Sequence, residues 1–126
     1  MTRSPMLTAT VWCLAATLCA AADAPPDFNR DVRPILSQTC FKCHGPDDGR
    51  RESGTRLDQR DSAVALGESG KRIIVPGQPD ASELIRRIES SDPDVMMPPP
   101  ATHLTLTAAQ KLARRAGVAG GGIMTS

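Results

Sequence analysis

The sequence predicts a small, mainly α-helical domain of about three helices joined by long loops. Apolar residues recur at helical spacing within 28–41, FNRDVRPILSQTCF, and within 82–90, SELIRRIES. A third segment, 107–115, begins with a threonine, a residue type that suits a helix N-cap. The residues between these segments are polar and rich in glycine and proline, which is typical of loops.

The first predicted helix carries its apolar residues at positions 28, 32, 35, 36 and 40, which fall on one helical face. Pro34 interrupts this segment. A proline is costly deep inside a helix but is tolerated in the first turn. We therefore expect the helix to begin near Arg33 or to kink there.

The second predicted helix has Ser82 at its N-cap and places Leu84, Ile85 and Ile88 on one face. The third begins after Thr107, and Leu112 is the large apolar side chain of its 108–115 stretch. Glycines recur beyond position 116 and disfavour helix. We therefore expect a disordered Gly-rich tail over 117–126.

The composition limits what the chain does. A length of 126 residues allows one small domain, and 15 Lys+Arg against 14 Asp+Glu give no basic excess for nucleic acid. The aromatic residues are Trp12, Phe28 and Phe41. So few large rings leave a small core poorly filled, which points to a bulky apolar cofactor.

The N-terminal segment has the features of a secretory signal peptide. Arg3 is its only charge before Asp23, and residues 6–22, MLTATVWCLAATLCAAA, are apolar or small. The stretch is shorter than the about 20 residues of a membrane span, and it ends in an A-x-A cleavage pattern. We predict a signal peptide over 1–22, a linker over 23–27, and a periplasmic or otherwise exported protein without stable membrane insertion after cleavage. An uncleaved N-terminal anchor and a lipoprotein signal lipidated at Cys19 remain alternatives.

The motif Cys40-Phe41-Lys42-Cys43-His44 has the C-x-x-C-H spacing of covalent haem attachment. Two cysteine thiols add to the two vinyl groups on one porphyrin edge, and the next histidine supplies an axial nitrogen to the iron. Attachment takes place outside the cytosol, in agreement with the export signal. The sequence therefore predicts one covalently attached haem C.

Three other interpretations of the motif stay open. A redox dithiol is expected within a βαβ context, which the loop-rich sequence lacks. A Cys40–Cys43 disulfide closes too small a loop to stabilise a fold much. A zinc site needs four ligands, and beyond the motif the chain after residue 22 offers only His103 as a further Cys or His.

The second axial ligand is predicted to be a methionine, as in electron-carrying cytochromes c. The candidates are Met96, Met97 and Met124. Pro98 forces Met97 into an extended conformation that can present its side chain to the iron, whereas Met96 would point to the opposite side. We predict Met97. His103 as the ligand, and simple core packing of both neighbouring methionines, remain alternatives.

Residues 28 to about 107 resemble the planctomycete-type cytochrome c domain. The resemblance rests on segments that occur in the family's order: FNRDVRPIL at 28–36, CFKCHGPD at 40–47, RLD at 56–58, GESG at 67–70, IVPG at 74–77, SELIRRI at 82–88, DPD at 92–94 and MPP at 97–99. It implies a cytochrome c-like domain over 28–116, wrapped around one haem. By this resemblance Cys40 and Cys43 bond the haem, His44 is the proximal ligand and Met97 the distal one.

The resemblance ends after about position 107. The family usually continues with a helix rich in Leu, Ile and Trp, whereas this chain reads LTAAQKLARRAGVAGGGIMTS. In the family the domain usually leads a longer protein with further domains. We therefore expect an altered or truncated C-terminus.

The predicted function is one-electron transfer to an unidentified redox partner protein, without enzymatic activity and without nucleic-acid binding. Two alternatives remain: a haem-bearing sensing or docking module of a larger extracellular enzyme system, and a non-functional gene fragment. Arg56, Lys71 and Arg72 are candidates to pair with the haem propionates.

Overall fold

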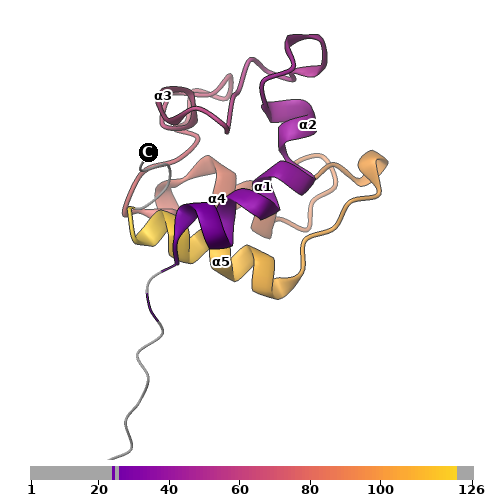
Figure 1. Cartoon of the computed structure of the whole chain (residues 1–126). Coiled ribbons are helices and arrows are strands. Elements are labelled where there is room, and N and C mark those ends of the chain that lie inside the picture. Colours follow the sequence, from indigo (N-terminus) through magenta and orange to yellow (C-terminus); the bar gives the residue numbers. More distant parts are fainter. Residues whose placement is uncertain (1–23, 25, 122–126) are drawn as a thin grey trace, which may run out of the picture.

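The computed structural model describes residue 24 and residues 26–121, and these residues form a mainly helical domain (Figure 1). The helices are α1 (Arg33–Thr39), α2 (Phe41–His44), α3 (Arg60–Ala63), α4 (Glu83–Glu89) and α5 (Ala108–Ala119). Helices α1, α4 and α5 are the three predicted from the sequence, while α2 and α3 are single turns. No strand occurs among the described residues, so the predicted mainly α class is confirmed.

Some of the predicted features lie outside the described residues. These are the signal peptide over 1–22, part of the linker, residues 122–126 of the predicted tail, and Met124. In the part of the chain that the structure describes, no helix has both the length and the apolar character needed to cross a membrane.

The first helix is irregular at the position that the sequence indicates. A wide π-type turn, η1 (Phe28–Val32), runs directly into α1, and the Arg33 N–H bonds the carbonyl of Phe28. Pro34 has no N–H, and its ring would collide with the carbonyl four residues earlier, so a regular α-helix cannot pass through this point. The widened turn keeps Phe28, Val32 and Leu36 on one buried face.

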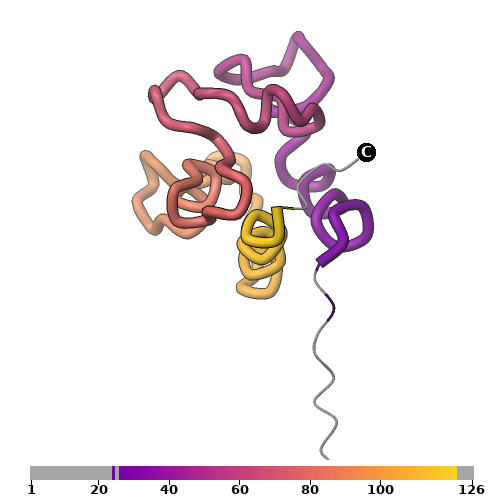
Figure 2. The backbone as a smooth tube through the Cα atoms, turned by 90° about the vertical axis from the view of Figure 1, so that its left-hand side faces the viewer, coloured from indigo at the N-terminus to yellow at the C-terminus, as the bar shows by residue number. Residues whose placement is uncertain are grey.

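Helix α5 lies between the first helix and α4, as Figure 2 shows. Its start is fixed by a capping box, in which the Thr107 hydroxyl accepts from the Gln110 N–H and the Gln110 side chain accepts from the Thr107 N–H. The predicted N-cap at Thr107 is therefore confirmed.

The predicted start of the disordered tail at 117 is wrong. Helix α5 continues to Ala119, Gly117 is buried, and Val118 is fully buried in the core. The carbonyl of Val118 also accepts from the Gly77 N–H at 2.8 Å. These tertiary contacts outweigh the low helix propensity of glycine.

The face that α5 turns inward differs from the apolar pattern of its sequence. Leu112 is 66% exposed, whereas Arg114 is 1% exposed. A charged side chain is almost never so deeply buried unless it is paired.

The hydrophobic core joins the first helix, the middle loops, α4 and the end of α5. Its buried members are Phe28, Val32, Leu36, Leu57, Ala63, Ile73, Ile74, Ile85, Ile88 and Val118. Cys40, Phe41 and Met97 pack against its edge. The motif and the loop that carries Met97 therefore pack against the same core.

Ser82 stands at the N-cap position of α4, as predicted, but its side chain does not cap the helix. Its buried hydroxyl instead accepts from the Val75 N–H at 2.8 Å and donates to the Gln78 carbonyl at 2.9 Å. It therefore fastens the extended segment before α4 onto the helix.

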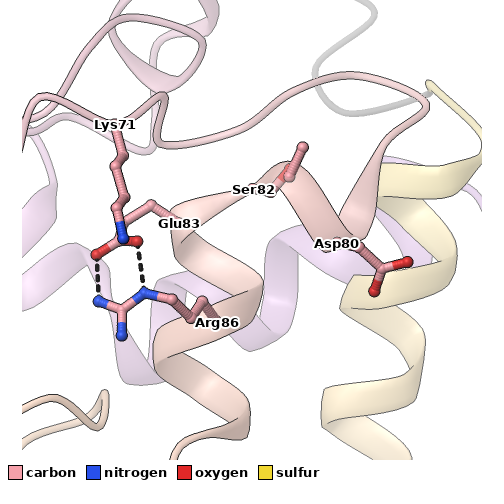
Figure 3. Close-up of a pocket in the computed structure, with 6 residues that line it drawn as sticks. Lys71, Asp80, Ser82, Glu83 and Arg86 are labelled. Atoms are coloured by element: carbon pink, nitrogen blue, oxygen red, sulfur yellow. Dashed lines mark hydrogen bonds and ion pairs between the residues drawn. The ribbon is translucent and has the colours of Figure 1, made fainter.

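Next to Ser82 is a pocket lined by charged side chains (Figure 3). The buried carboxylate of Glu83 accepts from Arg86 Nε at 2.7 Å and from Arg87 Nε at 2.9 Å. These hydrogen bonds lower the pKa of Glu83 to about 2, from its ordinary 4.5. Such a pocket is unsuited to a large apolar ligand.

Glu83 should stabilise the fold in a pH-dependent way. Its folded-state pKa is depressed, so its contribution is complete above pH 4.5 and is lost as the pH falls through about 2. We expect Glu83→Gln to lower the free energy of unfolding by about 1–2 kcal/mol at pH 7. The loss is modest because Arg86 and Arg87 are partly exposed and solvent screens their attraction to the carboxylate. Denaturant titrations from pH 7 to pH 2 would measure this.

The matched control is Glu89→Gln, which alters a more exposed carboxylate paired with Arg115 at 3.2 Å. We expect this control to change stability by less than about 0.5 kcal/mol. A Glu83→Gln deficit that stays constant down to pH 2 would contradict the assignment to this carboxylate.

Candidate functional site

The C-x-x-C-H motif forms the single-turn helix α2 and the residue before it. The His44 N–H bonds the Cys40 carbonyl at 2.8 Å, and the Cys43 N–H bonds the same carbonyl at 3.1 Å. Residues three and four apart share one side of a helical turn. The turn therefore brings Cys40, Cys43 and His44 to one face, which is the geometry that attachment to one porphyrin edge requires.

The side chain of His44 is half-buried, and its Nδ1 atom is fully buried without a hydrogen-bond partner. Burial lowers the pKa of His44, and the hydrogen-bonding backbone of Thr55 and Glu52 offsets this shift only in part. The imidazole is therefore neutral at pH 7, which is the form that binds metal. An unpartnered buried ring nitrogen agrees with a ligand role for this histidine.

The chain that follows His44 folds back along the motif. The Glu52 N–H bonds the Cys43 carbonyl at 2.8 Å, and the Leu57 N–H bonds the His44 carbonyl at 2.8 Å. These two bonds satisfy carbonyls that a short helix leaves free at its end. They also hold residues 52–57 beside the histidine ring.

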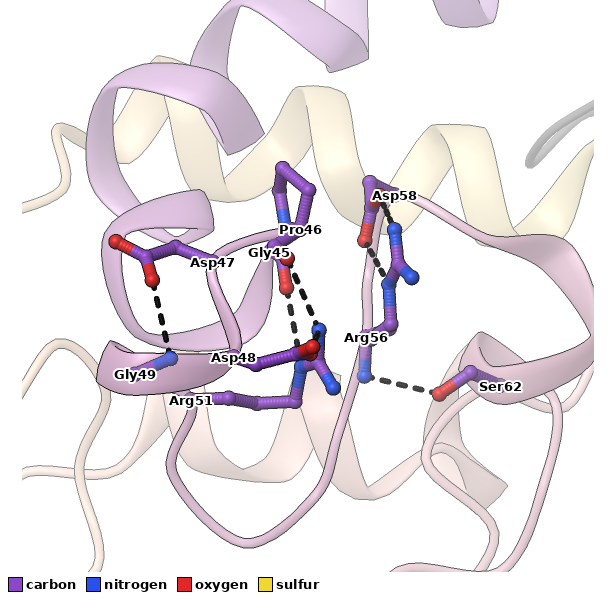
Figure 4. A network of polar contacts seen from close by, with 9 residues as sticks. All are labelled: Gly45, Pro46, Asp47, Asp48, Gly49, Arg51, Arg56, Asp58 and Ser62. Atoms are coloured by element: carbon purple, nitrogen blue, oxygen red, sulfur yellow. Dashed lines mark hydrogen bonds and ion pairs between the residues drawn. The ribbon is translucent and has the colours of Figure 1, made fainter.

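The side chain of Arg51 bonds the backbone of the loop between the motif and residues 52–57 (Figure 4). Its Nε donates to the Gly45 carbonyl at 3.2 Å, and its Nη2 donates to the Pro46 carbonyl at 3.1 Å. The guanidinium also pairs with Asp48. One planar side chain thus binds Gly45, Pro46 and Asp48 in the loop that follows His44.

Gly45 is buried at the abrupt turn out of α2. A Cβ atom placed there would lie 2.2 Å from the Phe41 carbonyl oxygen, and that oxygen belongs to the backbone. The neighbour cannot move aside without unwinding the helical turn. Glycine is therefore required directly after the histidine.

Met97 is tied to α4 through its backbone. Its N–H bonds the Arg87 carbonyl at 3.1 Å, and its side chain packs against the core. Arg87 also lies close enough to His44 to lower the pKa of that histidine. Arg87 of α4 is therefore a neighbour of Met97 through its backbone and an electrostatic neighbour of His44 through its side chain.

The other candidate axial ligands have less support from their positions. Met96 is half-buried and does not pack against the core as Met97 does. His103 is exposed, in a left-handed turn after the proline run.

The candidate propionate partners are engaged or exposed. Arg56 pairs with Asp58, its Nε donating to the carboxylate at 3.0 Å, and its N–H bonds the Ser62 hydroxyl at 2.9 Å (Figure 4). Lys71 is exposed, and Arg72 donates to the Val64 carbonyl at 3.0 Å. The structure does not direct these three cations toward the motif.

The competing interpretations of the motif find little support. Cys40 and Cys43 are free thiols, and no group of three or more Cys, His, Asp or Glu residues suited to a metal occurs in residues 26–121. The same stretch contains no strand on which a thioredoxin-like motif would lie. Two free thiols and a neutral imidazole on one face are instead the donor set that covalent haem C requires.

Sequence reasoning missed two residues that shape the site. Arg51 falls in a polar run whose loop contacts are not visible in a linear pattern. Arg114 lies 75 positions from its hydrogen-bond partner Thr39, so only the tertiary fold brings it near the motif. Gly45 lies in the segment CFKCHGPD at 40–47 that carries the resemblance, but its steric role appears only in the folded turn.

A protein-family model described as Planctomycete cytochrome C matches residues 40–101. The matched range contains the whole C-x-x-C-H motif and the MPP segment at 97–99, and it excludes η1, α1 and α5. Neither the curated proteins nor the solved structures contain a match to the chain.

We predict that Gly45→Ala strongly reduces haem attachment, because the added methyl group collides with the backbone that holds Cys40, Cys43 and His44 together. The yield of haem-bearing chain should fall several-fold, and any holo protein should be less stable by more than about 2 kcal/mol. Haem-stained gels and thermal melts would measure the two effects.

Gly49→Ala is the matched control in the same loop. A Cβ at Gly49 meets only the Asp47 side chain, at 3.4 Å. We expect normal haem attachment in this variant. Equal losses in both variants would mean that the loop, and not the turn at Gly45, limits attachment.

Proposed function

Residues 40–101 belong to the planctomycete cytochrome C family, and from this membership we propose that the chain is an exported c-type cytochrome domain that carries one haem and transfers single electrons. Family membership makes this a haem-binding domain and implies covalently bound haem C. The residue roles, the single haem, the export and the electron transfer are our proposal.

In this proposal Cys40 and Cys43 form the two thioether bonds, and His44 and Met97 are the axial ligands. The observation that carries it is the α2 turn, which presents both thiols and a neutral imidazole on one face. Met97 is proposed as the distal ligand because the MPP segment at 97–99 resembles the family's pattern and lies within the range that the family model matches.

Haem C, when bound, supplies an iron that changes oxidation state by one electron. His44 and Met97 would hold the iron from its two sides and would leave no position for a substrate. The chain also contributes the core edge formed by Phe41, Leu84 and Met97, against which an apolar ring can pack. We therefore assign electron transfer to a redox partner protein, and we assign no enzymatic reaction.

Export is proposed from the leader-like sequence over 1–22 and from the chemistry of haem attachment. Cytochrome c domains are typically exported, and the apolar N-terminal stretch agrees with this. A partner domain or protein that supplies or accepts the electron completes the proposal.

We predict that co-expression with a periplasmic haem-attachment system yields haem that acid–acetone does not extract. Pyridine haemochrome spectra should report thioether linkages. A Cys40→Ala, Cys43→Ala double variant is the control and should hold no covalent haem. Extractable haem in the wild-type protein would overturn the proposal.

We predict that Met97→Ala abolishes the weak near-infrared sulfur-to-iron absorption band of the ferric protein, because it removes the distal sulfur. Met96→Ala is the matched control and should retain the band. Loss of the band in the Met96 variant alone would transfer the role to that residue.

Carbon monoxide separates electron transfer from a haem-based sensing role. With both axial positions filled, we expect the ferrous protein to bind the gas slowly or not at all, and to cycle reversibly between oxidation states. Rapid binding would indicate an open position and would favour a sensing module.

A further inference from the structure

Arg114 is the most deeply buried charged side chain of the described fold. It is 1% exposed, and its Nε and Nη1 atoms are buried without a hydrogen-bond partner. Its Nη2 donates to the Thr39 hydroxyl at 2.6 Å. No carboxylate of residues 26–121 forms an ion pair with it.

The buried guanidinium lies against the attachment motif. The Thr39 hydroxyl that it bonds is 3.4 Å from the Cys40 sulfur, and Cys40 is itself a polar neighbour of the guanidinium. Thr39 ends α1 and Cys40 follows it directly. Helix α5 therefore places a positive charge beside the first cysteine of the motif.

Burying the guanidinium of Arg114 in this position destabilises the fold. A buried ion without a counter-ion loses hydration that a single hydrogen bond to a hydroxyl replaces only in part. Burial lowers the pKa of Arg114, yet a guanidinium stays charged in proteins. The neighbouring Arg115 illustrates the usual arrangement, since it pairs with Asp80 and Glu89 at the surface.

We propose that Arg114 raises the reduction potential of the haem attached through Cys40, by holding a buried positive charge next to the attachment edge. The inference rests on the proposed function, because it needs the covalent haem. The ferric centre carries one more positive charge than the ferrous centre, so a fixed cation nearby disfavours the ferric state. Low local polarity strengthens this effect.

The test measures the reduction potential of haem-bearing variants by mediated titration. Arg114→Met removes the charge and keeps most of the side-chain volume. We expect the ferric state to gain about tenfold, a shift of about 59 mV to lower potential for a one-electron couple. Arg114→Lys keeps the charge and should restore most of the wild-type potential.

Two further variants control the experiment. Arg115→Gln removes the adjacent surface charge and should leave the potential unchanged. Arg114→Gln repeats the neutralisation with a smaller polar side chain, in case the methionine variant folds poorly.

Several results would overturn the proposal. If Arg114→Met or Arg114→Gln keeps its haem and its reduction potential is unchanged, Arg114 has no electrostatic effect on the haem. Equal shifts in Arg114→Met and Arg114→Lys would assign the effect to packing, and loss of haem from both neutral variants would assign Arg114 to folding. A wild-type protein without covalent haem in the haemochrome assay would instead overturn the proposed function itself.

Discussion

The backbone of one helical turn determines the rest of the site. The Cys40 carbonyl accepts from both the Cys43 and the His44 N–H groups, and this double acceptance winds the motif so that both sulfurs and the imidazole share a face. Everything nearby preserves that turn. Gly45 lets the chain leave it without a collision, and Arg51 fixes the carbonyls that follow.

The turn also explains why the loop after the motif is long yet ordered. A four-residue helix cannot satisfy its own carbonyls, so the chain returns to supply the N–H groups of Glu52 and Leu57. The same return places the backbone of Glu52 and Thr55 next to the His44 ring. The pairing of the motif's carbonyls and the surroundings of the His44 ring therefore come from a single loop.

Local chemistry made part of this structure predictable. Pro34 marks an irregular first turn, Thr107 marks a helix start, and the C-x-x-C-H spacing marks a shared face, and each depends on neighbours in sequence. The failures involve distant neighbours. Ser82 occupies the predicted cap position, yet its hydroxyl bonds the backbone of Val75 and Gln78, in the loop before the helix, and does not cap the helix N-terminus.

Helix α5 shows the limits of pattern reasoning most clearly. Its apolar Leu112 is exposed, and its small residues, which suggest a frayed end, allow close approach to η1 and α4. Val118 then fills the core, and the Gly77 N–H ties down its carbonyl. Arg114 occupies the remaining inward position, where an apolar residue would pack at lower cost. Val118 and the Gly77 hydrogen bond hold the helix in place, and Arg114 connects it to Thr39 beside the C-x-x-C-H motif. Helix α5 therefore borders the candidate site, which its sequence pattern does not indicate.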